Sequence, residues 1–130
     1  MIILSIRTDK PLAEIGLYDD HKLIADHSWQ AHRQLAETIH LELKKLIEGS
    51  NKSWADLSGI VFYKGPGSFT GLRIGASVAN ALASSLKIPI AGEQSEEWLQ
   101  TGIDKLISNH DDQAVSIEYG KPVNITQPRK

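Results

Sequence analysis

The 130-residue sequence has no cysteine, no long hydrophobic run and no large excess of charge of either sign. The lack of cysteine excludes disulfide scaffolds, thiolate zinc sites and cysteine nucleophiles. The apolar run at residues 2–6 is too short for a signal peptide or a membrane span, so we expect a cytoplasmic protein that has no contact with membranes. Fourteen basic and sixteen acidic residues give a net charge of −2, which excludes a global positive field for nucleic acid.

The remaining composition is that of one ordinary globular domain. Hydrophobic residues make up 41% of the chain and charged residues 23%, which excludes wholesale disorder. A chain of this length is expected to form one domain with a single hydrophobic core, or one domain with a tail.

Hydrophobic patterning in the first half of the chain changes its period. Short apolar runs predict strands at residues 2–6, 12–18 and 22–29, which we expect to form an antiparallel meander. A helix is then expected at about 32–48, because apolar side chains fall there on one helical stripe. The members of this stripe are Leu35, Ile39, Leu43, Leu46 and Ile47.

Strands and helices alternate in the second half of the chain. We expect elements at residues 60–63, about 70–86, 88–91, 95–107 and 114–118, of which the first, third and last are strands. A strand–helix–strand order implies a right-handed crossover, and therefore a mixed sheet. The last residues, 120–130, contain basic residues and prolines but no acid, which is typical of an extended tail.

A glycine-rich turn joins the strand at 60–63 to the following helix. Its sequence, Gly-Pro-Gly-Ser-Phe-Thr-Gly-Leu-Arg-Ile-Gly at residues 65–75, allows close approach of the backbone and leaves free amides at a helix start. The spacing is neither that of a dinucleotide-binding turn nor that of a P-loop, and no lysine follows Gly71. Two functions of this turn remain open: it binds a phosphate, or it only docks the helix on the sheet.

The helix after this turn has two stripes of residues at i, i+4 spacing. One stripe has almost no side chains and consists of Gly71, Gly75, Ala79 and Ala83. The other is bulky and consists of Ile74, Val78, Leu82 and Leu86. We expect the bulky stripe to pack on the sheet and the small stripe to allow close approach of a second helix, either residues 32–48 or a helix of a partner.

The eleven residues from Gly65 to Gly75 resemble the signature of the TsaB (YeaZ) family, and residues 1–107 follow its order of elements. The resemblance implies the actin-like, sugar-kinase-like ribonuclease H fold, which is usually built of two lobes. We therefore expect an α/β protein in which residues 1–107 form a single ribonuclease H-like lobe, with a mixed five-stranded sheet flanked by helices. Residues 108–130 would be the remnant of a second lobe and a basic C-terminal tail.

The resemblance also implies a function. Members of the family are non-catalytic subunits of the machinery that installs threonylcarbamoyladenosine on the tRNA adenosine next to the anticodon. We expect a dimerisation or scaffold subunit that has no activity alone and pairs with a TsaD-like catalytic subunit and a TsaE-like ATPase. Without these partners it would form a homodimer, and it would meet tRNA only through the complex.

The pairing helices of the family correspond to residues 32–48 and 70–86. The resemblance implies a partner interface formed by Leu35, Ile39, Leu43, Gly71, Gly75, Ala79 and Ala83. A nucleotide at that interface would meet the signature loop, at Gly65, Pro66, Gly67, Ser68, Phe69, Thr70 and Arg73.

Two departures from nucleotide-using and metal-using relatives argue against catalysis. Such relatives carry an Asp-Thr pair at the end of the first strand, where this sequence has Arg7-Thr8, and a cation there repels Mg²⁺. TsaD-type proteins use a His-x-x-x-His pair, yet no two of the five histidines here are four residues apart. We expect no catalytic residue, no metal site and no cofactor on the chain alone, with ATP or ADP and Mg²⁺ only at an interface with the catalytic partner.

Two other functions are consistent with parts of the sequence. A small nucleotide-binding phosphotransferase or hydrolase would use the Gly65–Gly75 loop. Direct tRNA binding would use Lys121, Arg129 and Lys130, although three basic residues on a tail give only weak, salt-sensitive attraction.

Overall fold

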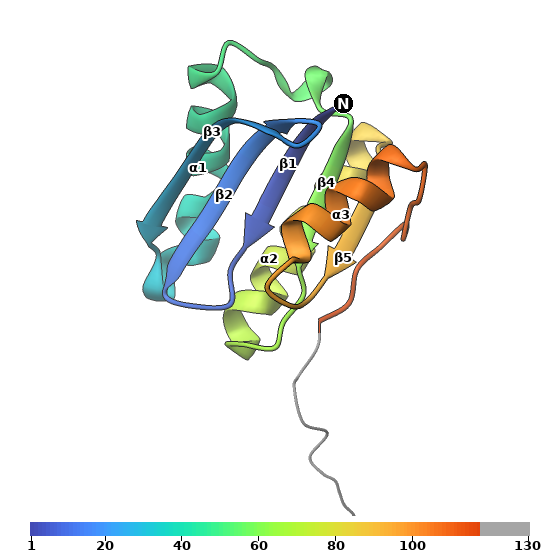
Figure 1. The fold of residues 1–130 in the computed structure, drawn as a ribbon. Coiled ribbons are helices and arrows are strands. Elements are labelled where there is room, and N and C mark those ends of the chain that lie inside the picture. Colours follow the sequence, from blue (N-terminus) through green and yellow to red (C-terminus); the bar gives the residue numbers. More distant parts are fainter. Residues whose placement is uncertain (118–130) are drawn as a thin grey trace, which may run out of the picture.

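The computed structural model describes residues 1–117 (Figure 1). Its strands are β1 (Ile2–Arg7), β2 (Leu12–Asp19), β3 (Lys22–Gln30), β4 (Gly59–Tyr63) and β5 (Ile90–Glu93). Its helices are α1 (Leu35–Gly49), α2 (Phe69–Leu86) and α3 (Trp98–Ile107), with short 3₁₀ turns at His32–Gln34 and Trp54–Asp56.

The five strands form one sheet in the order β3-β2-β1-β4-β5. β2 pairs antiparallel with β1 and β3, which confirms the predicted meander. β4 pairs parallel with β1 and with β5, and the predicted crossover through α2 joins β4 to β5. The predicted fold class is therefore confirmed: a mixed five-stranded sheet flanked by helices.

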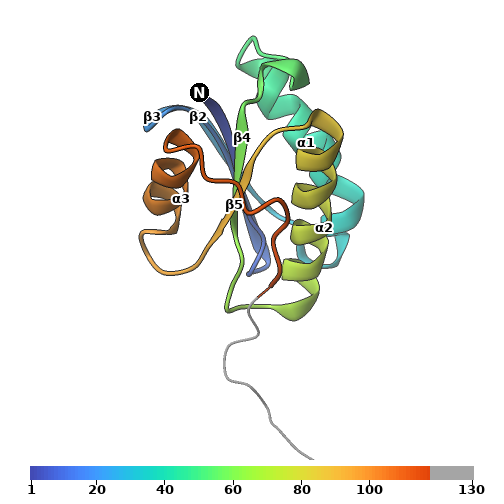
Figure 2. The ribbon, with the colours of Figure 1, turned by 90° about the vertical axis from the view of Figure 1, so that its right-hand side faces the viewer.

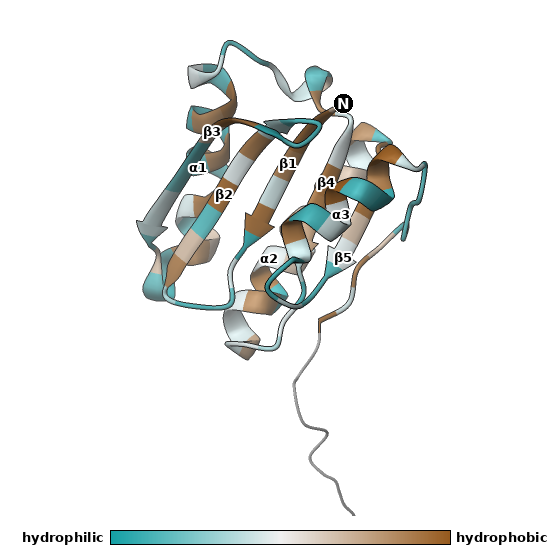
Figure 3. Cartoon of the chain, viewed as in Figure 1, coloured by the Kyte–Doolittle hydropathy of each residue, from teal (hydrophilic) through white to brown (hydrophobic). Residues whose placement is uncertain are grey.

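The helices cover the two faces of the sheet unequally. Figure 2 shows α1 and α2 on one side of the sheet and α3 alone on the other. Side chains alternate between the two faces, so that Phe62 lies against α2 while Val61 lies against Gly102 of α3. Hydrophobic and hydrophilic residues accordingly alternate along β2 (Figure 3).

The buried core lies between the sheet and the α1–α2 layer. The paired strands β1 and β4 place Leu4 beside Ile60 and Ile6 beside Phe62, and all four side chains are fully buried. β2 continues this apolar face with Ile15 and Leu17. The stripe of α1 packs on the same face, which explains why the helix predicted at 32–48 forms as an amphipathic helix.

The two edges of the sheet end differently. β3 is an exposed edge strand over most of its length. At β5, the N–H groups of Ile90 and Gly92 donate to the side chains of Asp111 and Asp112, and the N–H of Asp112 donates to the carbonyl of Ile90. Because aspartate side chains take the place of a strand here, the strand predicted at 114–118 is wrong for residues 114–117.

Two element boundaries also differ from the prediction. α3 begins at Trp98 and not at Ser95, because Ser95 has a φ of 99°, which no α-helix accommodates. β5 begins at Ile90, one residue after Pro89, which has no N–H to donate to a neighbouring strand.

Some predictions concern residues that the structure does not describe. The basic tail at 120–130, with Lys121, Arg129 and Lys130, lies outside the described residues. The division into a lobe at 1–107 and a second-lobe remnant at 108–130 stays a prediction. None of the helices within residues 1–117 is long and apolar enough to cross a membrane.

Candidate functional site

The small stripe of α2 faces the sheet. A Cβ on Gly75 would overlap the Thr8 hydroxyl and lie 2.9 Å from the Phe62 ring, and a Cβ on Gly71 would overlap the Thr8 carbonyl. Ala79 and Ala83 are buried, whereas Ile74 and Leu82 of the bulky stripe are only half-buried. The predicted orientation of α2 is therefore wrong, because the short side chains allow its backbone to lie directly on β1 and β4.

This orientation also changes the predicted partner interface. Six of its seven residues are buried inside the chain: Leu35, Ile39, Leu43, Gly75, Ala79 and Ala83. Gly71, the seventh, is half-buried against Thr8. In this structure the six buried residues belong to the core under α1 and α2, and the partner interface itself stays a prediction.

The exposed sides of α1 and α2 form a groove instead. It has a volume of about 400 Å³ and is lined by Ala36, His40, Phe69, Thr70, Arg73, Ile74, Ser77 and Val78. Phe69 is 47% exposed, and the Arg73 guanidinium lies 5.3 Å from the centre of its ring. A large aromatic side chain beside a hollow between two helices is typical of a protein-binding surface.

Only part of this groove could be predicted from the sequence. Phe69, Thr70 and Arg73 of the signature loop line it. Ala36 and His40 were missed as site residues, although their i, i+4 spacing places them on one helical face beside the apolar stripe of α1.

The first residues of the signature loop pack on the end of β1. Gly65 has a φ of 114°, a conformation that favours glycine, and the Gly65–Pro66 peptide is cis. A Cβ on Gly67 would overlap Asp9, and the Ser68 N–H donates to the Asp9 carbonyl at 2.9 Å. The Ser68 hydroxyl accepts from the Gly71 N–H and so caps α2.

An ion pair occupies the end of β1, where nucleotide-using relatives carry aspartate. Arg7 Nε donates to one Asp9 carboxylate oxygen at 2.8 Å and Arg7 Nη2 to the other at 3.2 Å. The guanidinium carbon lies 4.0 Å from the centre of the Tyr63 ring. The hydrogen bond to Asp9 raises the pKa of Arg7 and outweighs the lowering effect of burial, so the guanidinium stays charged.

These residues do not fit the magnesium–nucleotide complex that the fold would imply at this position. The Asp9 side chain is only 6% exposed, and both of its oxygens accept from Arg7. The close contact between Gly67 and Asp9 leaves no space for a phosphate between the loop and β1. Within residues 1–117, no three His, Asp or Glu side chains are grouped so that they could hold a metal ion.

Known proteins resemble this chain over most of its described length. The protein-family model described as "TsaD: tRNA N6-adenosine threonylcarbamoyltransferase" matches residues 29–105. The TsaB protein of Bacillus subtilis is 36% identical over 111 residues, which cover 83% of this chain and 48% of that protein. Its Escherichia coli counterpart is 32% identical over 92 residues, or 71% of this chain and 39% of that protein.

Solved structures show the same fold. YeaZ from Pseudomonas aeruginosa superposes with a TM-score of 0.67 at 24% identity, over 72% of this chain and 43% of that chain. A Listeria monocytogenes protein whose suggested activity is that of an N-acetylmannosamine kinase superposes with a TM-score of 0.51 at 20% identity, over 80% of this chain and 41% of that chain. The chain spans less than half the length of these relatives.

Proposed function

Because this chain belongs to the TsaB (YeaZ) family, we propose that it acts in tRNA threonylcarbamoyladenosine biosynthesis as a non-catalytic dimerisation subunit. Its partner is a TsaD-like catalytic subunit, and a TsaE-like ATPase joins the pair. Without the partner the chain forms a homodimer. It meets tRNA only through the complex.

The groove between α1 and α2 is the observation that carries this proposal. It is lined by Phe69, Thr70 and Arg73 of the signature turn, and Phe69 at the start of α2 exposes nearly half of its surface. Exposed aromatic side chains bury a large area when a partner covers them. We assign the partner contact to residues that line the groove, in place of the buried residues that the family resemblance implied. They are the exposed Ala36, His40, Phe69, Arg73 and Ser77 and the half-buried Ile74.

The end of β1 supports a subunit that has no activity alone. Arg7 neutralises Asp9, and the loop backbone packs directly on Thr8 and Asp9. The proposal therefore includes no cofactor on the isolated chain, with ATP or ADP and Mg²⁺ bound only at the interface with the catalytic partner. The phosphotransferase alternative has no observation in its favour, because the Gly65–Gly75 loop touches Thr8 and Asp9 where it would need to hold phosphate.

Size-exclusion chromatography with light scattering, with and without a TsaD-like protein, tests the pairing. Ser77→Arg places a long charged side chain in the groove and should weaken co-elution about tenfold or more, because the charge loses its water on binding. Ser85→Arg is the matched control, since Ser85 is exposed on the same helix and does not line the groove.

Three outcomes would contradict the proposal. The chain could remain a strict monomer that ignores the partner. Ser77→Arg could pair as well as Ser85→Arg. Calorimetric titration of the isolated chain with ATP and Mg²⁺ could give saturable binding, which would favour the enzyme alternative.

A further inference from the structure

The middle of the signature turn, from Pro66 to Thr70, is exposed at all five residues. Hydrophobic burial therefore contributes little to holding this segment in place. Two hydrogen bonds tie it to the sheet. The Tyr63 hydroxyl donates to the Pro66 carbonyl at 3.2 Å, and the Ser68 N–H donates to the Asp9 carbonyl at 2.9 Å. The conformation of the turn thus depends on where Tyr63 and Asp9 lie.

Arg7 contacts both of these residues with one planar group. Its guanidinium donates two hydrogen bonds to the Asp9 carboxylate, and the same group lies 4.0 Å from the centre of the Tyr63 ring. A guanidinium can make both contacts at once, because its edge donates to the carboxylate while its flat face stacks on the ring. Tyr63 and Asp9 are each 7% exposed, so water competes little with either contact.

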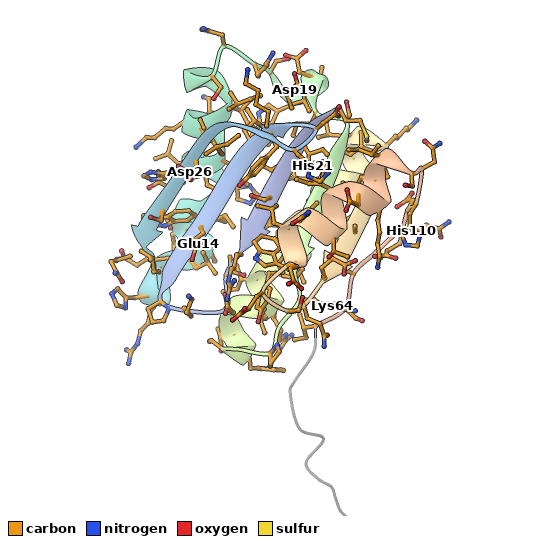
Figure 4. The ribbon with its side chains drawn as sticks, viewed as in Figure 1. Glu14, Asp19, His21, Asp26, Lys64 and His110 are labelled. Carbon is orange, nitrogen blue, oxygen red and sulfur yellow. The ribbon has the colours of Figure 1, made fainter. Side chains whose placement is uncertain are left out.

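Neighbouring strands and α3 fix the position of Arg7. Arg7 stands opposite Glu14 in the last pair of the β1–β2 ladder. Figure 4 shows Glu14 on β2 and Lys64 directly after β4, and β2 and β4 are the strands on the two sides of β1. From α3, the Trp98 ring lies 5.9 Å from the guanidinium carbon and packs edge-to-face on Tyr63. Arg7 therefore links the α3 face of the sheet to the signature turn.

The turn leads directly to Phe69, which follows Ser68 as the first residue of α2 and lines the α1–α2 groove. The helix itself has a separate anchor, because the Thr8 hydroxyl donates to the Gly71 carbonyl at 2.8 Å. The contacts that begin at Arg7 therefore act on the segment just before the helix, where the chain enters the groove.

We propose that Arg7 is a positioning residue, which holds the signature turn, and with it Phe69, in the conformation that pairs with the catalytic partner. This inference rests on the proposed pairing through the α1–α2 groove. Arg7 is not among the residues that line the groove, so its effect on pairing passes through Asp9, Tyr63 and the turn. A side chain of the protein itself thus orders the turn, which needs no bound ligand for its conformation.

Hydrogen exchange of the Ser68 N–H, followed by NMR on the whole chain, tests the hold on the turn without a partner. Arg7→Met keeps an unbranched apolar side chain and removes the guanidinium. Exchange at Ser68 should become about tenfold faster, because Asp9 and Tyr63 lose the group that joins them. The Ile6 N–H lies in a strand paired on both sides, so its exchange corrects for any loss of global stability.

Lys105→Met is the matched control on the same face of the sheet. Like Arg7, Lys105 is the cationic partner of a carboxylate that is almost buried, since its ammonium lies 2.6 Å from the Glu93 carboxylate. That ion pair joins α3 to β5 and is not part of the contacts that lead to the turn. The variant should leave the ratio of exchange rates at Ser68 and Ile6 unchanged.

Two milder variants keep the test valid if Arg7→Met does not fold. Tyr63→Phe removes only the hydroxyl that donates to Pro66 and should speed exchange at Ser68 about threefold. Arg7→Lys keeps the positive charge but has no flat group to stack on the ring, so its exchange rate should lie between those of the parent and Arg7→Met.

A double-mutant cycle connects the turn to the pairing. Arg7→Met should weaken binding to a TsaD-like protein, measured by calorimetry, about fivefold. Phe69→Ala should weaken it about tenfold or more, because it removes an exposed aromatic side chain from the groove. The double variant should bind no more weakly than Phe69→Ala alone, since Arg7 acts through Phe69.

The two experiments fail in different ways. Unchanged exchange at Ser68 in Arg7→Met, or an equal increase in Lys105→Met, would overturn the hold of Arg7 on the turn. Additive losses in the cycle, or normal pairing by Arg7→Met, would overturn the route through Phe69. A parent chain that does not pair at all would contradict the proposed function and the pairing half of the inference, whereas the exchange comparison decides the positioning of the turn independently.

Discussion

The face of the sheet toward α1 and α2 can be compared with the face toward α3, since the same strands supply both. On the first face, β1 and β2 present Leu4, Ile6, Ile15 and Leu17, all of them buried. On the second face, the same strands present the buried Ile3 but also Ser5, Arg7, Glu14 and Gly16, and α3 covers mainly β4 and β5. Strict alternation along two short strands thus makes one face uniformly apolar and the other mixed, with its apolar part under α3.

Glycine allows close packing on both faces, against different groups. At Gly75 the backbone of α2 lies against Thr8 and Phe62. At Gly16 the Ser5 hydroxyl oxygen and the Tyr18 ring edge take the space of a side chain, since a Cβ there would lie 2.7 Å and 2.9 Å from them. Glycine therefore brings a helix onto the sheet on one face and lets neighbouring side chains close over the strand on the other.

Adjacent alanine substitutions in β1 test this comparison with the largest expected effect. Leu4→Ala should destabilise the protein by about 2–5 kcal/mol, because it removes buried methyl groups and leaves a cavity. Ser5→Ala, one residue further, should change stability by less than about 0.5 kcal/mol, because its hydroxyl makes no hydrogen bond to any of residues 1–117. Urea unfolding measures both, and similar losses for the two variants would contradict the assignment of the faces.

A methyl group added at Gly75, between α2 and the sheet, tests the comparison with an intermediate expected effect on stability. Gly75→Ala should destabilise by about 1–3 kcal/mol through overlap with Thr8, although alanine is the better helix former. Gly49→Ala is the matched control, because a Cβ there meets nothing within 4 Å. Thermal unfolding should show a lower Tm for the first variant and an unchanged or higher Tm for the second. Equal Tm values would show that α2 does not lie directly on β1.

The smallest expected effect is at the edge of β5, where the Asp111 and Asp112 side chains accept from backbone N–H groups. Burial by itself would raise the pKa of Asp112, but the hydrogen bond from the Gly92 N–H and the contact with His110 lower it below its ordinary value. A carboxyl group whose pKa is lowered by folding stabilises the native state above its unfolded pKa, and this contribution is lost as the pH falls through the folded pKa.

Asp112→Asn should therefore cost about 1 kcal/mol of stability near neutral pH, from the weakened hydrogen bonds to Gly92 and His110. The difference between variant and parent should shrink below about pH 4, where the unfolded carboxyl is protonated. Urea unfolding as a function of pH measures the difference in free energy of unfolding between the variant and the parent. A difference that stays constant into the acid range would show that the Asp112 carboxylate charge does not stabilise the edge of β5.

Much of the fold could be predicted because its signals are local. Period-2 and period-3.6 patterns indicated the strands and helices of residues 1–107, and the signature turn pointed to the correct family. The strand expected at 114–117 failed because Asp111 and Asp112 satisfy the edge of β5 with their side chains, a contact between segments about twenty residues apart.

The candidate sites depended more on packing than on pattern. Phe69, Thr70 and Arg73 were found because they belong to the signature turn, whereas the seven residues expected at the interface proved to be mostly core. Helical spacing groups residues into stripes, but two apolar stripes on one helix leave open which of them faces the sheet.

The sequence by itself determined the order of the elements, the mixed sheet, the tight turn at Gly65–Gly75 and the lack of a His-x-x-x-His pair, because each follows from neighbouring residues. Only the tertiary structure decided that the small stripe of α2 lies on Thr8 and that the Arg7 guanidinium pairs with the Asp9 carboxylate. It alone also placed Ser5, Gly16 and Asp26 in one row. These outcomes depend on side-chain volume and strand register between distant segments, which no local pattern encodes.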